Sequence, residues 1–387
     1  MWFFNSPQVV FGEDALTWLS QLNGQRAMIV TDPIVEKLGF VDRVKEQLTA
    51  AGMNYEVFAE IEPDPCLQTI KECALKMESI NPDWVIGLGG GSCMDAAKTA
   101  WFLYERPDVP LEAINPMEVF NLRAKARLIT IPTTSGTGSD VSWGFALANP
   151  DEKCKLVRVT RELVPDIALV DPAFTTALPQ PLTAETGLDV LAHAIEGYTC
   201  LWHNDFTDGL CIKAIQLVFK YLPRAFSDGS DLEAREHMHN AATIAGLGFS
   251  NTAIILAHAM AHALGGYFHT PHGRTVGMFL PYTIEFIAKK DPGRYFEIAG
   301  ELNLAAHDEQ QAVASLVAEI RKLQEFLKQP ISIKEMGITL EELDQALPHL
   351  VLNISSAVEL VATPRIPTNE EVDKLIHYAY EGRKIDF

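Results

Sequence analysis

Four histidines lie within fifteen residues of a segment otherwise made of small, aliphatic and aromatic residues: His258, His262, His269 and His272, in ILAHAMAHALGGYFHTPHG. The first two are four residues apart, so on a helix both imidazoles project from one face. We expect Gly265 and Gly266 to end this helix, and we expect the last histidine to follow in a loop.

A second pair lies upstream in GLDVLAHAIEGY, where Asp189 and His193 are also four residues apart, in a pattern typical of a buried helix. One carboxylate and several imidazoles that converge from two apolar helices would bind a divalent metal ion with open coordination positions. A single histidine on an apolar helix is more often a core residue, but several such groups each need a partner, and one cation supplies most of them. The H-x-x-x-H pattern lacks the glutamate of the H-E-x-x-H motif, which excludes a zinc protease of that type.

The composition is that of a folded protein with two domains of ordinary size: 387 residues, of which 48% are hydrophobic and 21% charged. A formal net charge of -20 argues against nucleic acid or an anionic membrane as a partner, because both favour basic surfaces. No apolar run reaches the roughly 18 residues of a membrane span, and the opening MWFF is too short for a signal peptide. Six cysteines without a C-x-x-C pair favour reduced thiols, so we expect a cytoplasmic protein.

The elements that must position these groups change in character near residue 180. Residues 1–180 alternate short apolar runs with amphipathic segments, which is typical of an α/β domain with a parallel, Rossmann-like sheet. Strands are expected at 26–31, 55–58, 83–88 and 128–131. Residues 181–387 predict an all-helical domain, with helices at 184–200, 208–221, 232–247, 253–264 and 312–327. Both halves of the histidine constellation lie in this second domain.

Two loops rich in glycine and hydroxyl groups follow strands of the first domain. The strand at 83–88 runs into the sequence GGGS, and the strand at 128–131 leads into PTTSGTGSD. Glycines let the backbone approach a phosphate, and a helix N-terminus supplies N–H groups and a positive dipole. One such loop is equally consistent with a tight turn that binds nothing, but two at the carboxyl ends of strands favour a dinucleotide site.

Asp32 follows the first of the expected strands and precedes Pro33. A carboxylate at this point of a dinucleotide-binding domain accepts hydrogen bonds from ribose hydroxyls and repels the 2′-phosphate of NADP. The same residue would serve equally well as the N-cap of a helix that starts at the proline. The sequence leaves both interpretations open.

Together these motifs resemble those of the iron-containing (group III) alcohol dehydrogenase family, and the resemblance covers nearly the whole chain. It rests on the opening F-x-x-P-x-x-x-F-G and on GGGSCMDAAK, PTTSGTGS, PDIALVDP, GLDVLAHAIEGY, AHAMAHALGGYFHTPHG and TPRIPTNEEV, which occur in the family's order. The resemblance implies an N-terminal α/β dinucleotide-binding domain and a C-terminal helical domain, as in dehydroquinate synthase. It also implies an NAD(H)-linked alcohol dehydrogenase or aldehyde reductase that depends on a metal.

The resemblance assigns roles to individual residues. The family's metal ligands fall on Asp189, His193, His258 and His272. His262 matches a histidine beside the nicotinamide that does not bind the metal, and His269 matches no ligand. The cofactor-binding positions fall on Asp32, Gly89, Gly90, Gly91, Ser92, Asp95, Thr133, Thr134, Thr137 and Lys155.

Several positions depart from the family's pattern. Asp140 stands where the family commonly has glutamate. Thr363 stands where the family commonly has asparagine, and this second difference should affect packing only. Trp143 and Phe145 replace small or aliphatic residues. These two aromatic side chains could narrow the active site or pack beneath it, and the sequence does not decide between the two arrangements.

The expected mechanism follows from the donor set. One carboxylate and three imidazoles accept either Fe²⁺ or Zn²⁺, which would polarise the substrate oxygen while hydride passes to or from C4 of the nicotinamide. His262, near the metal but not bound to it, is the expected proton relay because imidazole titrates near neutral pH.

Two other functions have to be weighed. A cyclase or lyase of the dehydroquinate synthase type also uses NAD and a metal, but its phosphorylated substrate needs several basic residues, and Arg274 stands almost alone near the histidines. A non-catalytic metal-binding protein would leave the two loops without a purpose. For the dehydrogenase we expect a small alcohol or aldehyde, with Arg274 or His269 as candidates to bind an anionic substituent. We also expect a homodimer or higher homo-oligomer, as is common in the family.

Overall fold

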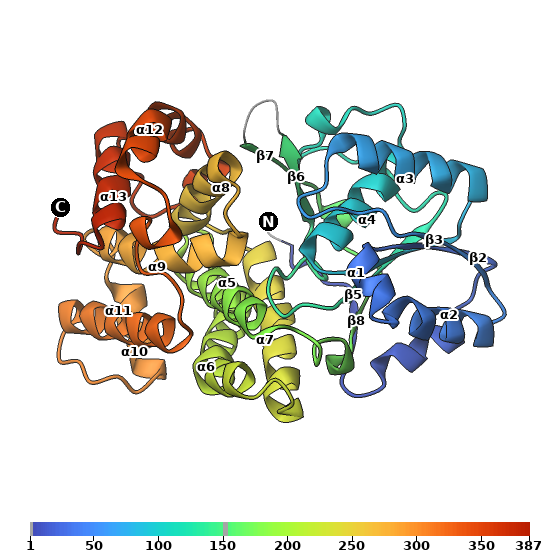
Figure 1. Ribbon diagram of the computed structural model, residues 1–387, viewed down its shortest axis with the longest axis horizontal. Coiled ribbons are helices and arrows are strands. Elements are labelled where there is room, and N and C mark those ends of the chain that lie inside the picture. The colour runs from blue at the N-terminus through green and yellow to red at the C-terminus, as the bar shows by residue number, and fades with distance from the viewer. Residues whose placement is uncertain (1–2, 150–153) are drawn as a thin grey trace. The chain divides into compact units, whose positions relative to one another are not determined.

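The computed structural model describes residues 3–149 and 154–387, and the chain divides into two compact units, Met1–Leu178 and Pro179–Phe387 (Figure 1). Within the described residues, all strands belong to unit 1, and unit 2 is built from helices. The expected fold class, an α/β domain followed by an all-helical domain, is confirmed. In the described part of the chain, no helix combines the length and the apolar character that crossing a bilayer requires.

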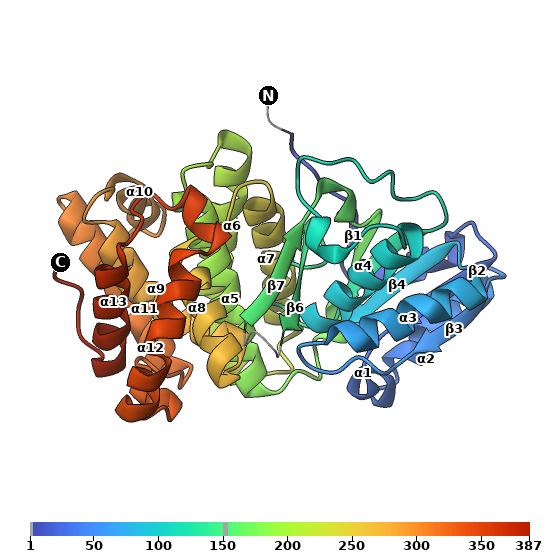
Figure 2. The same ribbon diagram turned by 90° about the horizontal axis from the view of Figure 1, so that it is seen from above.

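Unit 1 is organised around a six-stranded sheet in the order β1-β8-β5-β4-β2-β3, in which every pairing is parallel. The chain passes from β2 to β3 on one side and then crosses to β4 on the other, so the direction of winding reverses between β2 and β4. Figure 2 shows β2, β3 and β4 running side by side. Open α/β sheets bind ligands at such a switch point, beyond the carboxyl ends of the strands. The sheet strands are β1 (Gln8–Phe11), β2 (Arg26–Val30), β3 (Asn54–Phe58), β4 (Trp84–Gly89), β5 (Arg127–Pro132) and β8 (Ile167–Val170).

Helices cover both faces of this sheet. Met28 and Val30 of β2 pack in one core with α3 and α4, whereas Ala27 and Ile29 pack in another with α2 and the 3₁₀ helix η1. This alternation is the two-residue period of a strand buried on both faces. The helices are η1 (Ala15–Gln21), α1 (Pro33–Lys37), α2 (Phe40–Ala50), α3 (Leu67–Ile80) and α4 (Gly91–Glu105), with short 3₁₀ turns η2 (Leu111–Ala113), η3 (Arg161–Leu163) and η4 (Pro172–Phe174).

A separate antiparallel pair joins β6 (Gly144–Asn149) to β7 (Cys154–Val159). Neither this pair nor the four-residue strands β1 and β8 is predicted from the sequence, because short segments carry little periodicity. Phe145 of β6 is buried in the core that contains α3 and α4, so it packs against that layer. Trp143, just before β6, is half-buried.

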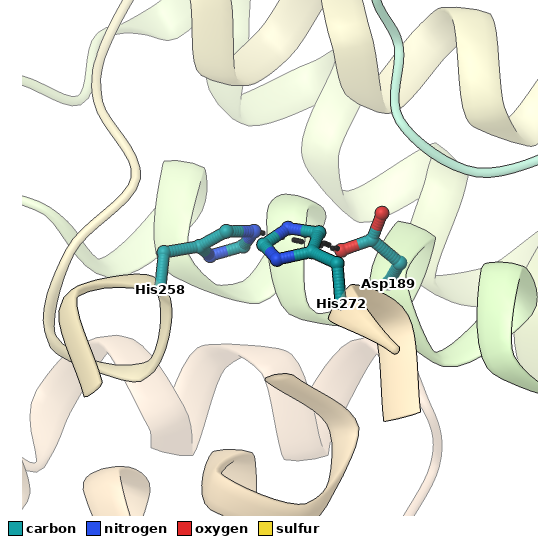
Figure 3. Close-up of side chains that lie close together, drawn as sticks. All are labelled: Asp189, His258 and His272. Atoms are coloured by element: carbon teal, nitrogen blue, oxygen red, sulfur yellow. Dashed lines mark ion pairs between the residues drawn. The ribbon is translucent and has the colours of Figure 1, made fainter. Parts of the chain in front are cut away.

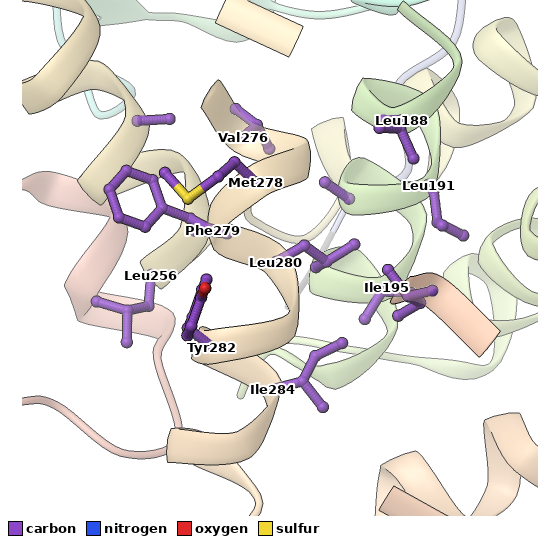
Figure 4. Close-up of a cluster of buried hydrophobic side chains, with 14 of the residues drawn as sticks. Leu188, Leu191, Ile195, Leu256, Val276, Met278, Phe279, Leu280, Tyr282 and Ile284 are labelled. Carbon is purple, nitrogen blue, oxygen red and sulfur yellow. The ribbon is translucent and has the colours of Figure 1, made fainter. Parts of the chain in front are cut away.

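Unit 2 has one continuous hydrophobic core to which most of its helices contribute. Leu188 and Ile195 of α5 face Leu280 and other apolar residues of α9 (Figure 4). The two helices approach closely at Gly277, where an added Cβ would lie 2.9 Å from the Leu188 side chain. The helices are α5 (Gln180–Thr199), α6 (Asp205–Ser227), α7 (Leu232–Ser250), α8 (Leu256–Phe268), α9 (His272–Ile287), α10 (Gly293–Glu301), α11 (Glu309–Phe326), α12 (Leu340–Ser355) and α13 (Asn369–Glu381), with η5 (Lys334–Met336) and η6 (Val358–Ala362).

The predicted end of the histidine-bearing helix was wrong. Helix α8 continues through Gly265 and Gly266 to Phe268, and His269 ends it with a left-handed backbone, φ 55°. A glycine inside a helix costs about 1 kcal/mol relative to alanine, which burial of an apolar helix offsets. His272 is likewise not in a loop, because it is the first residue of α9.

Candidate active site

Three helices of unit 2 bring the ligand atoms of Asp189, His258 and His272 within 4.8 Å of one another. Oδ1 of Asp189 lies 3.6 Å from Nε2 of each of the two histidines, as the dashed lines in Figure 3 indicate. Two ligands that each lie about 2.1 Å from a tetrahedral metal are roughly 3.4 Å apart, so this spacing suits a common ion.

Two of these ligand atoms, from Asp189 and His258, also fit a cation because they have no hydrogen-bond partner among the described residues. Oδ1 of Asp189 and Nε2 of His258 are fully buried, and neither has a hydrogen-bond partner among the described residues. Leaving such atoms unsatisfied in the core is costly, and a divalent cation would satisfy both. An acidic oxygen with imidazole nitrogens is a donor set for Fe²⁺ or Zn²⁺.

Glu196, which the sequence analysis did not single out, orients His258. Its carboxylate accepts a hydrogen bond from Nδ1 of His258 at 2.5 Å, and it also accepts the backbone N–H groups of Ile255 and Ala257 at 3.0 and 2.6 Å. It therefore satisfies N–H groups at the start of α8 and leaves Nε2 of His258 as the nitrogen that would bind a metal ion. Glu196 lies seven residues after Asp189 on the same helix, so its spacing carried a usable signal.

The charges of this group shift the pKa values. Burial alone would lower the pKa of His258, but the carboxylates of Glu196 and Asp189 outweigh it and raise the pKa to about 9. Burial alone would raise the pKa of Asp189, yet the surrounding imidazoles hold that pKa well below its usual range. The pocket therefore favours a protonated His258 beside ionised Asp189, and a divalent cation bound at Nε2 would take the place of that proton.

His193, the fourth predicted ligand, lies beside this group but is not part of it. Its Nδ1 is 3.9 Å from Oδ1 of Asp189. Its ring stacks against His258 at 4.5 Å between centroids and against Phe249 at 4.3 Å. The structure thus brings three of the four predicted ligands together, and coordination by His193 stays a prediction.

His262 lies next to the group, as predicted, and it has a carboxylate partner that was not predicted. Its Nδ1 is 2.8 Å from Oε1 of Glu359 in η6, and its ring stacks on His272 at 5.0 Å between centroids. Burial would raise the pKa of Glu359, but the hydrogen bond and charge of His262 outweigh it and lower that pKa. His269 is exposed at the end of α8.

Arg274 and Glu185 form an ion pair on the neighbouring turns of α9 and α5. Nη2 and Nε of Arg274 lie 2.6 and 3.1 Å from Oε1 of Glu185. Glu185 is buried, so its charge has to be compensated locally. The guanidinium supplies that compensation and is therefore already engaged.

The two predicted cofactor loops of unit 1 contact each other at the carboxyl edge of the sheet. The N–H of Thr133 donates to the carbonyl of Gly89 at 3.0 Å. An added Cβ on Gly91 would lie 2.7 Å from Cγ2 of Thr137, and one on Gly90 would lie 3.4 Å from Thr134. Gly89 has φ 148°, which side chains other than glycine rarely adopt. Gly89 is therefore required by its backbone conformation and Gly91 by loop packing, in addition to any role toward a phosphate, whereas Gly90 leaves room for a methyl group.

Two further predicted cofactor positions of unit 1, Asp95 and Ser92, have protein partners. Asp95 accepts hydrogen bonds from Oγ of Ser139 at 2.5 Å and from the N–H of Ala146 at 2.9 Å, so it ties α4 to the second loop and to β6. Oγ of Ser92 accepts the N–H of Asp64 at 3.3 Å. Lys155 lies in β7, and its side chain is outside the described part of the structure.

Asp32 stands at the switch point between β2 and β4 and caps a helix. Its Oδ1 accepts the N–H groups of Ile34 and Val35 at 2.7 and 2.8 Å, and Oδ2 accepts the thiol of Cys93 at 3.1 Å. The helix-cap interpretation is therefore correct. A carboxylate has further lone pairs, so a ribose contact through Oδ2 is compatible with it and stays a prediction.

Comparison with known proteins identifies the family. Residues 6–172 match the model of the iron-containing alcohol dehydrogenases, and residues 183–380 match the C-terminal part of the Fe-containing alcohol dehydrogenase family. The chain is 35% identical over 387 residues to the NADPH-dependent butanol dehydrogenase of Clostridium saccharobutylicum, covering 99% of each chain. It is 35% identical to the 1-propanol dehydrogenase of Citrobacter freundii, covering 94% of this chain and 96% of that one. The crystal structure of a 1,3-propanediol oxidoreductase superposes with a TM-score of 0.92 at 27% identity, over 98% of this chain and 100% of the other. The chain belongs to the iron-containing alcohol dehydrogenase family.

Proposed function

We propose that this protein is an NAD(H)-linked, metal-dependent dehydrogenase that interconverts short, uncharged aliphatic aldehydes and primary alcohols. The observation that carries the proposal is the convergence of Asp189, His258 and His272 on one point, where one cation would satisfy the buried Oδ1 of Asp189 and Nε2 of His258 together. We assign His193 as the fourth ligand, because its ring already lies beside His258 and its Nδ1 is near Asp189.

Residues of the protein orient the metal ligands and supply the proton for the proposed reaction. Fe²⁺ or Zn²⁺ bound here would act as a Lewis acid on the substrate oxygen, and the reduced nicotinamide would supply hydride from C4. Glu196 fixes the His258 ring so that its Nε2 faces Asp189. Reduction of the aldehyde takes up one hydride at carbon and one proton at oxygen, and we assign delivery of that proton to Nε2 of His262.

The preference for NAD over NADP rests on Asp32. Its carboxylate stands beyond β2, beside the glycine loop, where the adenosine ribose of a dinucleotide lies in such folds. A 2′-phosphate would meet like charge there. The butanol dehydrogenase relative is named as NADPH-dependent, so this preference is a specific proposal for the present chain.

The preference for an uncharged substrate rests on the lack of an available basic side chain among Arg274 and His269, the two candidates near the metal ligands. Arg274 is neutralised by Glu185, and His269 is exposed at the end of α8. Glu359 adds a buried negative charge beside His262. A carboxylate or sulfonate group on the substrate would find no compensation from these residues. The engaged Arg274 also disfavours the lyase alternative, whose phosphorylated substrate needs free basic side chains.

The test is anaerobic NADH oxidation by metal-stripped enzyme to which Fe²⁺ or Zn²⁺ has been returned. The substrates are butanal, propanal and 3-hydroxypropanal, compared with aldehydes of the same length that carry a carboxylate or a sulfonate. We expect metal-dependent turnover with the uncharged aldehydes and a kcat/KM at least about tenfold lower for the anionic ones. Absence of turnover with both metals, despite tight binding of NADH, would contradict the proposed function.

A further inference from the structure

Glu359, a buried residue that is not among the predicted metal ligands, lies beside His262, the expected proton relay. Glu359 lies in η6, 97 residues after His262 in the sequence, and its Oε1 is 2.8 Å from Nδ1 of that histidine. Glu359 is only 8% exposed, although Val358 and Val361 on the same turn are 69% and 63% exposed. The turn thus buries its one charged side chain together with Leu360 and Ala362 while it exposes two valines, and a buried unpaired carboxylate would be costly.

The turn that carries Glu359 is itself held in place. Oγ1 of Thr363 donates a hydrogen bond to the backbone carbonyl of Glu359 at 3.1 Å. Among the described residues, no side chain other than His262 hydrogen-bonds to the Glu359 carboxylate. A buried carboxylate with a single imidazole partner depends on that partner for its stability, and the imidazole depends on it for its orientation.

The pairing leaves one nitrogen of His262 for chemistry. With Nδ1 donating to Glu359, only Nε2 is able to exchange a proton with a ligand. The His262 ring lies nearly parallel to that of His272, with 16° between the planes, and its centroid is 6.0 Å from that of His258. A third imidazole this close to two metal ligands would compete for the same ion if it were able to rotate freely.

We propose that Glu359 is a positioning residue that locks His262 with Nε2 toward the substrate and withholds its ring from the metal. The first half of this role rests on the proposed function, since it concerns proton delivery during aldehyde reduction. The second half concerns only how the protein binds a divalent ion and can be measured without any substrate.

The first experiment compares metal coordination in Co²⁺-loaded protein by visible absorption. Glu359→Ala frees Nδ1 of His262, so we expect an altered ligand-field spectrum, which the double variant Glu359→Ala/His262→Ala returns to the wild-type form. Glu359→Gln keeps an acceptor oxygen for Nδ1–H and should keep the wild-type spectrum. Asp344→Asn is the matched control, because it removes a carboxylate 3.3 Å from the surface residue His377. A wild-type spectrum in Glu359→Ala would overturn the withholding role.

The second experiment measures coupling between the two residues by thermal unfolding and by kinetics. His262→Ala leaves a buried carboxylate without this partner, so adding Glu359→Ala should raise the melting temperature again. Turnover should fall about tenfold or more in Glu359→Ala, stay within about fivefold of wild type in Glu359→Gln, and fall no further when Glu359→Ala is added to His262→Ala. KM for NADH should not change.

Additive effects of the two substitutions on melting temperature and on kcat would assign Glu359 a merely structural role and overturn the proposal. If Glu359→Ala alone does not fold, the comparison of His262→Ala with the double variant still decides the question, because a double variant that is no more stable than His262→Ala would overturn the pairing. If the wild-type enzyme reduces no aldehyde, the proposed function fails, whereas the cobalt spectra and the thermal coupling still decide whether Glu359 controls His262.

Discussion

Glu196 and His258 form a buried pair in which one carboxylate both orients a predicted metal ligand and accepts backbone hydrogen bonds from the start of the helix that carries it. Oε2 of Glu196 accepts hydrogen bonds from Nδ1 of His258 at 2.5 Å and from the N–H of Ile255. Oε1 accepts a hydrogen bond from the N–H of Ala257. The negative charge also lies at the positive end of the α8 dipole. The position of the helix and the direction of the ligand nitrogen are therefore set by the same group.

Replacing Glu196 by glutamine should weaken metal binding about 10- to 100-fold. An amide has one acceptor oxygen, so its NH₂ group would face either the backbone N–H of Ala257 or the donors that now share Oε2. Calorimetric titration of metal-free protein measures the effect. Glu297→Gln, which changes a half-exposed partner of Arg294, is the matched control and should leave the affinity unchanged. Equal affinities for Glu196→Gln and wild type would contradict the orienting role.

Replacing Asp32 by serine should shift cofactor preference toward NADPH by at least about tenfold in the ratio of kcat/KM values. Serine keeps the N-cap hydrogen bonds to Ile34 and Val35 but removes the charge that would repel a 2′-phosphate. Steady-state kinetics with both cofactors gives the ratio. An unchanged ratio, in a variant that unfolds at the wild-type temperature, would mean that Asp32 only caps the helix.

The residues of the candidate metal site could be predicted from the sequence because helical spacing is local. Asp189 and His193 share a face of α5, and this periodicity needs no tertiary information. Glu196 extends the same face by one more turn and was overlooked, although the rule that found Asp189 applies to it equally. In contrast, no local pattern connects His262 with Glu359, because a contact across 97 residues depends on how the helical unit folds.

Burial is a second property that the local sequence does not determine. His239 lies in the polar stretch AREHMHN, which carries no sign of a core position, yet its side chain is only 1% exposed. Helix α7 packs against both α5 and α6, so polar residues on its inner face are buried whatever their neighbours in sequence. Helix α8 also continues beyond Gly265 and Gly266, because burial of an apolar helix outweighs the low helix propensity of two glycines.

Substituting Gly91 should test whether the two cofactor loops are packed as tightly as the structure indicates. Gly91→Ala puts a methyl group 2.7 Å from Cγ2 of Thr137, so it should lower the melting temperature of unit 1. Thr137→Ser removes that methyl, and the double variant should recover most of the loss. Gly90→Ala, where the added Cβ meets Thr134 at 3.4 Å, is the control and should be nearly neutral. Equal destabilisation with Thr or Ser at position 137 would contradict the predicted contact.

Buried His239 should make the protein less stable in mild acid. Burial lowers its pKa in the folded state from 6.5 to about 4, so below pH 6.5 the unfolded chain takes up a proton that the folded chain does not. Its contribution to stability is complete above pH 6.5 and is lost between pH 6.5 and about 4, by roughly 3 kcal/mol at most.

Melting temperature measured across this pH range tests the effect. His239→Gln should show a smaller decrease from pH 7 to pH 4.5 than the wild type, because glutamine does not titrate. His237→Gln, two residues away on the same helix and half-exposed, is the matched control and should keep the wild-type slope. Identical slopes for His239→Gln and wild type would assign the acid sensitivity to other groups.

The central claim is that Asp189, His258 and His272 hold one divalent ion, and anaerobic titration of metal-free protein with Fe²⁺ tests it most directly. We expect one ion per chain for the wild type and for His269→Ala, whose exposed side chain lies only three residues from His272. His272→Ala should weaken binding at least about 100-fold, and His193→Ala should do the same if His193 is the fourth ligand. Wild-type affinity in His272→Ala would contradict the metal site and the mechanism that depends on it.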